Sequence, residues 1–454
     1  MTISAPVAFG LALHRPRWAL AAALAALVTA SFCWPLWPGL MSYDSVYAYT
    51  EARLGVETML WPPAHAYLFW ISERLGAGPG GLFAAQTSIL FFAAALIFSL
   101  AVKRAPVVIM AFVAFTGAFV LFPPLLGSLA AQWRDVTTAS FTLLGIALWL
   151  AAAQVRSKFL LAGAAAAFSL ALALRYNAFP LVFALLGLMV LQPFGEASGA
   201  RIRLAALAFA ALGCALAYAS TVWRLPDLAR PPPPQAFSAT QAFDLIGMSA
   251  CLDRSLLPPA VTADKPISGD QLRRAYDPRH LQLAYQPRDG VPPILQTDGA
   301  GAVQAAWRRE IPRQWRCYLA HRTLVLVEQL GMAKRGVFYP VHGGIDANRF
   351  GVRLSRPEAA AQVGGFVERN SQPLWRRPFV LHALAGLIAL AACFASAPGR
   401  LILAAGWLGS AAYVGLLFVV APAADARYIF PPNAICALIV VLGVICLSRR
   451  RAGR

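Results

Sequence analysis

Residues 80–102 read GGLFAAQTSILFFAAALIFSLAV, an apolar run without a charged side chain. A helix rises about 1.5 Å per residue, so about 20 apolar residues cross the roughly 30 Å hydrocarbon core of a bilayer. The rest of the chain has the same character, since 59% of its 454 residues are hydrophobic and only 13% are charged. This composition lies outside the range of soluble domains and predicts an integral membrane protein.

Similar runs recur along the chain and predict an all-α polytopic membrane protein with about ten transmembrane helices. The candidate spans are residues 17–38, 80–102, 106–126, 136–153, 158–174, 177–193, 202–222, 378–396, 401–421 and 428–447. No convincing small-residue cleavage site follows the first run, so we interpret it as a membrane anchor and not as a cleaved signal.

The long polar stretch between the seventh and eighth runs divides the chain into three parts. We assign residues 1–222 to an N-terminal transmembrane module, residues 223–377 to an extracytoplasmic loop domain and residues 378–454 to a C-terminal transmembrane module. The loop domain begins with a proline-rich segment, and helical spacing of its apolar residues predicts a mostly helical fold. Its two cysteines, Cys251 and Cys317, form either a disulfide or two free thiols.

Basic residues in short loops indicate the orientation, because they favour the cytoplasmic side. They occur at alternate ends of the predicted helices, at Arg15, Arg17, Lys103, Arg104, Arg156, Lys158, Arg201, Arg203, Arg400 and Arg449. This pattern predicts that both termini lie in the cytoplasm. The predominance of Arg over Lys is typical of a GC-rich bacterial genome, so we expect a bacterial inner-membrane protein. The net charge of +19 does not gather on a soluble face, so we expect no nucleic-acid partner.

The first extracytoplasmic loop, residues 39–79, holds two segments too short to span a bilayer. They read GLMSYDSVYAY, from residue 39, and WPPAHAYLFWISERL, from residue 61. Their aromatic residues suit the headgroup region, so we expect interfacial helices that lie along the membrane. Within the first of them Asp44 is a lone carboxylate close to the predicted membrane surface.

Other ionisable side chains occur at the same predicted depth. They are Arg134 and Asp135 in AQWRDV, Arg175 beside Asn177 in LRYNAFP, and Asp425 and Arg427 in DARYIFP. Each taken alone is explained by interfacial anchoring or snorkelling. The cytoplasmic ends carry almost only Lys and Arg, whereas these ends mix acids, amides and bases. Together they predict a polar site at one membrane face.

The order of these segments resembles the GT-C superfamily of polytopic glycosyltransferases. The resemblance rests on WPGLMSYDSVYAY, WPPAHAYLFW, AQWRDVTTASFTLLGIALWL, LALRYNAFPLVFALL and ARYIFPPNAICALIV, with AFDLIGMSACL and YLAHRTLVLVEQL in the loop domain. It is strongest toward bacterial relatives of protein O-mannosyltransferases and of lipid A aminoarabinose transferases. It implies transfer of a hexosyl, pentosyl or aminosugar group from a polyprenyl-phosphate donor to a lipid, glycan or protein acceptor.

The resemblance also suggests roles for individual residues. It assigns Asp44 to the reaction centre and Asp135 to the second acid. Where relatives have His-Pro-Pro or Lys-Pro-Pro, this chain has Trp61, Pro62 and Pro63, which leaves open whether His65 supplies the polar group.

The chemistry of these groups fits inverting glycosyl transfer. Asp44 is the candidate general base that takes the proton of the acceptor hydroxyl, and we expect partial burial to raise its pKa. The candidate ligands of the donor phosphate are Arg134, Arg175 and Arg427. The candidate substrate-binding residues are Tyr43, Trp61, His65, Asn177 and Tyr428. Asp44 and Asp135 could also hold Mg²⁺ or Mn²⁺ through hard oxygen ligands.

Three other classes of function stay open at this stage. A lipid-linked oligosaccharide ligase or polymerase would also have many spans, but it would depend on bases of the loop domain. A transporter or flippase needs ionisable groups or broken helices near the bilayer midplane, whereas the charges here gather at one face. A non-catalytic scaffold is the third.

Overall fold

The computed structural model describes residues 5–55, 63–191, 237–262, 267–281, 283, 286–291, 293–294, 299–397 and 399–452. Over these residues the protein is helical, with isolated β-bridges in place of strands. The predicted span 202–222 and residue Trp61 lie outside the described residues.

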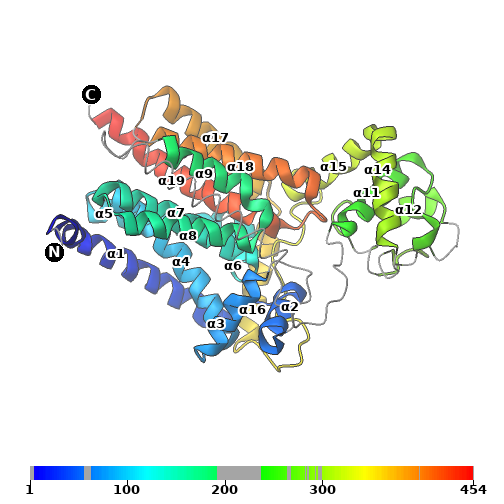
Figure 1. Ribbon diagram of the computed structural model, residues 1–454, viewed down its shortest axis with the longest axis horizontal. Helices are drawn as coiled ribbons and strands as arrows, with labels where there is room; N and C mark the ends of the chain where they lie inside the picture. Colours follow the sequence, from blue (N-terminus) through cyan, green and yellow to red (C-terminus); the bar gives the residue numbers. More distant parts are fainter. Residues whose placement is uncertain are drawn as a thin grey trace.

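Five of the described helices are long and apolar enough to cross a membrane. They are α1 (Ala5–Leu36, apolar from Arg17), α4 (Gly78–Ala101), α7 (Arg134–Val155), α18 (Arg400–Val420) and α19 (Phe430–Ala452). Three shorter apolar helices lie in the same bundle: α8 (Lys158–Leu174), α9 (Phe179–Leu191) and α17 (Pro378–Phe394) (Figure 1). The bundle agrees with a membrane protein, although it does not establish the predicted count of ten spans.

The predicted span 106–126 is not one straight helix. The chain forms α5 (Ala105–Leu121) and α6 (Pro123–Leu129), which meet at an angle of 93°. Pro123 and Pro124 have no backbone N–H to donate, so the α5 ladder ends at Phe122. The short α6 turns away and packs against α16 (Pro357–Asn370). Gly127 of α6 allows the close approach of the loop that follows α15, because a Cβ there would lie 2.1 Å from the carbonyl oxygen of Pro340.

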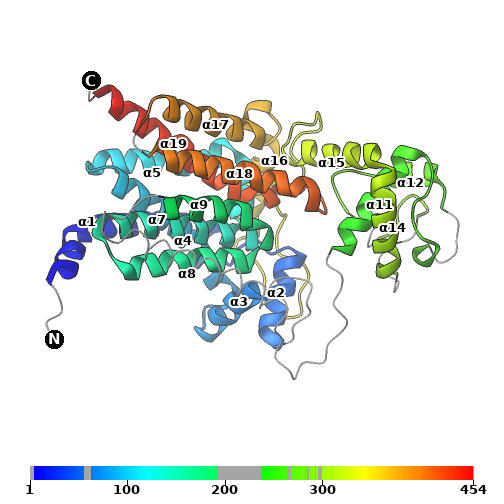
Figure 2. The ribbon, with the colours of Figure 1, turned by 45° about the horizontal axis from the view of Figure 1, so that its top comes forward.

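The two ends of the bundle differ. Both chain termini lie at one end, and α2 (Tyr43–Leu54), α3 (Ala64–Arg74) and α16 lie toward the other (Figures 1 and 2). The predicted pair of short helices in the first loop therefore corresponds to α2 and α3. Asp44 falls in the first turn of α2, where the helix dipole favours an acid.

The central part of the loop domain forms a small helical unit beyond the α2 end of the bundle (Figure 1). Its helices are α11 (Ser238–Leu252), α12 (Gly269–Ala275), α14 (Ala300–Arg313) and α15 (Trp315–Gln329). Its core contains Leu245, Ile246, Leu272 and Val303. Short 3₁₀ turns complete the described elements at Tyr176–Ala178 (η1), Pro259–Val261 (η2), Leu374–Arg376 (η3) and Ala426–Ile429 (η4).

A buried polar network joins this helical unit to the bundle. Nε of Arg322 lies 2.7 Å from the Asp244 carboxylate, and Nη1 of Arg322 donates a 2.7 Å hydrogen bond to the carbonyl oxygen of Ala421, just after α18. Both charged side chains are fully buried. His321 also faces Asp244, with Nε2 at 3.2 Å, and Trp307 donates to the same acid at 2.6 Å. Arg322 is therefore a direct contact between the two parts.

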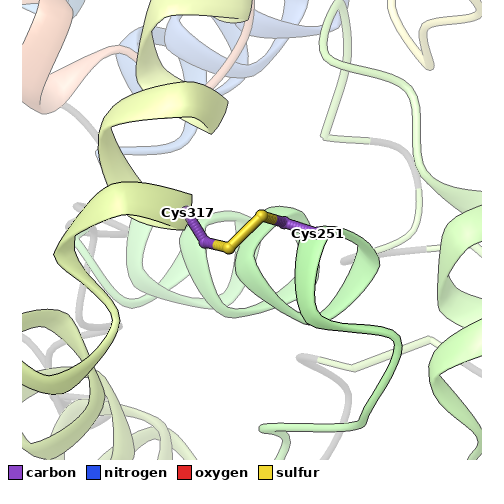
Figure 3. Close-up of a disulfide and its surroundings, with 2 residues drawn as sticks. All are labelled: Cys251 and Cys317. Atoms are coloured by element: carbon purple, nitrogen blue, oxygen red, sulfur yellow. A yellow bond between two sulfur atoms is a disulfide. The ribbon is translucent and has the colours of Figure 1, made fainter.

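Cys251 on α11 and Cys317 on α15 form a disulfide, with their Cα atoms 5.8 Å apart (Figure 3). Of the two alternatives that the sequence leaves open, the structure contains the bond.

Cross-linking by this disulfide restricts the unfolded chain, which typically stabilises a fold by about 2–4 kcal/mol. We expect Cys251→Ser/Cys317→Ser to lower the melting temperature of the purified protein. Cys393→Ser, which alters a cysteine outside the disulfide, is the control. Equal melting of the double variant and wild type would contradict this expectation.

Candidate functional site

The segment before α2 is paired with the segment before α7. The backbone N–H of Leu40 donates to Ala130 and its carbonyl accepts from Gln132, both at 2.9 Å. The hydroxyl of Ser45 donates to the carbonyl of Gln132, at 2.8 Å, and the indole N–H of Trp133 donates to Ser42, also at 2.8 Å. These bonds fix the start of α2, which carries Asp44, beside the start of α7, which carries Asp135.

Arginines from distant parts of the chain pair with these acids. Nη1 of Arg427, in η4, lies 2.7 Å from the carboxylate of Asp44, and its Nε lies 3.2 Å from that of Asp425. Nη1 of Arg175, just after α8, lies 2.6 Å from Asp135, which is 1% exposed. The structure thus assembles the acids and arginines that the sequence analysis selected at separate loop positions.

Aromatic rings support both guanidinium groups. Arg427 lies over Trp133 and Tyr428, with 5.1 Å from its Cζ to each ring centroid, and Arg175 lies over Tyr428 at 4.9 Å. A cation above a ring face is attracted by the ring quadrupole. The ring of Tyr428 therefore contacts both guanidinium groups and holds the two positive charges near each other.

A small cavity opens beside Asp44. Its lining consists of Asp44, Ser45, Ala48, His65, Gln132, Trp133, Arg134, Asp135 and Arg427. The space open to a water-sized molecule is about 10 Å³, roughly what one water molecule needs. A sugar can enter only if lining side chains move.

The pKa of Asp44 differs from the sequence expectation. Burial raises the pKa of its carboxyl, as expected, but the positive charges of Arg427, Arg134 and Arg175 lower it by more, so the pKa lies below the ordinary value of 3.8. Because 22% of the side chain is exposed, water weakens the effect of burial. The expectation of a raised pKa was therefore wrong, since the sequence alone does not indicate that three arginines surround this acid.

His65 lies on α3 with its ring 5.0 Å from the ring of Phe69. Burial and the positive charge of Arg134 lower the pKa of His65 to about 3. Its imidazole is therefore neutral at physiological pH. The side chain is 4% exposed, and its Nε2 atom has no hydrogen-bond partner.

The other predicted substrate-binding residues lie apart from the cavity lining. Tyr43 is 63% exposed at the start of α2, and Asn177 is half-buried in η1. The ring of Tyr428 contacts the guanidinium groups of Arg175 and Arg427, so it affects the cavity only through these arginines. Tyr43 and Asn177 could therefore contact only a ligand that extends beyond the cavity.

Four residues that line the cavity were not among the predicted site residues: Ser45, Ala48, Gln132 and Trp133. Gln132 and Trp133 lie inside the AQWRDV motif, so weighing the uncharged positions of that motif would have found them. Asp425, which the sequence analysis grouped with the polar ends but gave no role, pairs with Arg427. The loop after α15 also approaches the site, because the rings of Tyr339 and Trp133 lie 6.1 Å apart.

A divalent cation stays a prediction for Asp44 and Asp135. Each carboxylate contacts an arginine, and the residues that the structure describes include no group of three His, Cys, Asp or Glu side chains suited to a metal ion. A Mg²⁺ ion would have to displace a guanidinium group or share the site with a ligand phosphate.

Comparison of the chain with models of protein families, with curated proteins and with solved structures finds no match.

Proposed function

We propose that the protein is a membrane glycosyltransferase of the GT-C type, acting at the extracytoplasmic face of a bacterial inner membrane. The observation that carries this proposal is the cavity in which Asp44 and Asp135 meet Arg134 and Arg427, with Arg175 behind Asp135. Such a site can bind a phosphate through its arginines and accept a proton through its carboxylate. Both abilities are needed to transfer a sugar from a polyprenyl-phosphate donor.

The ion pair between Arg427 and Asp44 suggests how the two abilities are linked. A donor phosphate competes with Asp44 for the Arg427 guanidinium, because both are anions. As Arg427 turns toward the phosphate, the pKa of Asp44 rises and its carboxylate becomes a better base. Asp44 then takes the proton of the acceptor hydroxyl while that oxygen attacks the anomeric carbon. The bond to the phosphate breaks on the opposite side, which inverts the anomeric centre.

The direct test is release of polyprenyl phosphate from synthetic polyprenyl-phosphate mannose, glucose and arabinose by the purified protein. Membrane extract supplies the acceptor. Turnover of at least one donor is expected. If every single-sugar donor stays intact while lipid-linked oligosaccharide is consumed, the proposed transfer of one sugar is wrong.

The pKa of Asp44 predicts the pH dependence of this reaction. A base must be ionised in the free enzyme to act, and a lowered pKa keeps Asp44 ionised down to acidic pH. As the pH is lowered, kcat/KM should begin to fall only when Asp44 becomes protonated. We expect the midpoint of this acidic limb to lie below pH 3.8, the ordinary pKa of an Asp. Measuring kcat/KM for donor turnover between pH 4 and 8, with the fold monitored by circular dichroism, tests this. An acidic limb near pH 6 in a folded protein would contradict it.

A further inference from the structure

Apart from Oδ1 of Asp135, which pairs with Arg175, two buried polar atoms on residues that line the cavity beside Asp44 have no hydrogen-bond partner. They are Nε2 of His65 and Oε1 of Gln132, both on residues that line the cavity. Gln132 is 0% exposed. Leaving a buried polar group unpaired is energetically unfavourable. Two such atoms around one cavity therefore indicate a place prepared for a polar group of a ligand.

The orientation of Gln132 is fixed by its other atom. Its side-chain N–H donates a 2.9 Å hydrogen bond to the carbonyl oxygen of Pro38, so the amide nitrogen cannot exchange places with Oε1 without losing this bond. Oε1 can only accept a hydrogen bond. His65, being neutral, has one ring nitrogen that donates and one that accepts.

These properties select the ligand group. A hydroxyl can donate one hydrogen bond to Gln132 and, through its oxygen, accept another from His65. An ammonium group fits less well, because Arg134 brings a positive charge that already disfavours a charged His65 and would repel a cationic ligand. The cavity therefore favours a neutral hydroxyl.

We propose that His65 and Gln132 form a subsite for one hydroxyl group of the transferred sugar, and that this contact selects the donor. The inference rests on the proposed glycosyl transfer. Arg427 lines the same cavity, so a donor whose phosphate reaches Arg427 brings its sugar hydroxyls close to His65. The acceptor hydroxyl that reacts lies at Asp44, and the subsite holds a second, unreactive hydroxyl.

The test compares the best of the three synthetic donors with its monodeoxy analogues. Release of polyprenyl phosphate is measured with water as the sole acceptor and again with membrane extract. For wild type, removal of one hydroxyl should lower kcat/KM by at least about tenfold, because it leaves buried groups of the subsite unpaired. His65→Phe keeps an aromatic ring beside Phe69 but lacks the ring nitrogens. In this variant kcat/KM for the parent donor should exceed kcat/KM for the same deoxy analogue by less than about threefold.

Two further variants keep the result interpretable. His65→Gln retains a hydrogen-bonding group and should give an intermediate ratio. His382→Phe removes a different, half-buried histidine, one that bonds Asn433 at 2.9 Å on another helix, and should keep the wild-type ratio. Equal ratios in wild type and His65→Phe for every analogue would overturn the subsite. If His65→Phe kept the wild-type ratio for every donor analogue and lost turnover only when extract is present, the hydroxyl would belong to the acceptor and the donor assignment would be overturned. If wild type turns over no parent donor, the proposed function itself fails.

Discussion

Asp44→Asn should leave a folded protein that has lost at least about 10²–10⁴-fold of its donor turnover, the usual contribution of a general base. The amide has the shape of the carboxylate but does not take a proton from the acceptor. It also removes the charge that pairs with Arg427 at 2.7 Å. The measurement is kcat for release of polyprenyl phosphate, at equal amounts of protein eluting at the same volume in size-exclusion chromatography.

Asp270→Asn is the matched control for Asp44→Asn. Asp270 lies on α12 with 57% of its side chain exposed and pairs with Arg274, 2.6 Å away, on the same helix. Exposed pairs of this kind contribute little, so the control should keep wild-type turnover. Turnover within threefold of wild type in Asp44→Asn would remove Asp44 from the role of base. The carboxylate of Asp135 would then be the next candidate.

Arg322→Met should destabilise the protein by roughly 3–5 kcal/mol, the cost of leaving a buried charge without its partner. Methionine fills much of the space, but Asp244 stays buried and loses its contact with Nε at 2.7 Å. The hydrogen bond to Ala421 is also lost, so the helical unit is held less firmly to the bundle. Differential scanning fluorimetry in detergent gives the change in melting temperature.

The histidine beside this pair makes the result depend on pH. His321 lies 3.2 Å from Asp244 and can replace the lost positive charge when it is protonated. The destabilisation by Arg322→Met should therefore be smaller at pH 5 than at pH 8. Arg274→Met, which removes an exposed arginine on α12, should change stability by less than about 1 kcal/mol at either pH. A loss in Arg322→Met no larger than in this control would show that the buried pair is not a major source of stability.

Apolar run length predicted much of the helical bundle, because a long apolar helix leaves a simple periodic signal. The two short helices of the first loop were predicted as well, from aromatic residues flanked by polar ones. The bend within residues 106–126, which the apolar run did not predict, has a local cause. Pro123 and Pro124 lie inside an apolar run, so counting hydrophobic residues gave them no weight, although two adjacent prolines cannot continue a helix.

The site was predictable only as a collection of residues. The sequence analysis grouped Asp44, Asp135, Arg175 and Arg427 because all of them lie at the same predicted depth in the membrane. Which acid pairs with which arginine depends on how α2, α7, α8 and α19 pack. For this reason the predicted direction of the Asp44 pKa shift was wrong, whereas the choice of Asp44 as the base stays a prediction. Gln132 was missed because an amide within an apolar segment has no charge to mark it.

The position of Arg427 has a consequence for biosynthesis. A ribosome makes the N-terminal part of a chain first, so Asp44 on α2 is inserted long before the arginine that pairs with it, just ahead of α19. Asp135 meets Arg175 much earlier, because α7 and α8 follow each other directly. A nascent chain that stops after α18 therefore lacks the ion-pair partner of Asp44, and its first-loop carboxylate then has only the charges of Arg134 and Arg175 near it.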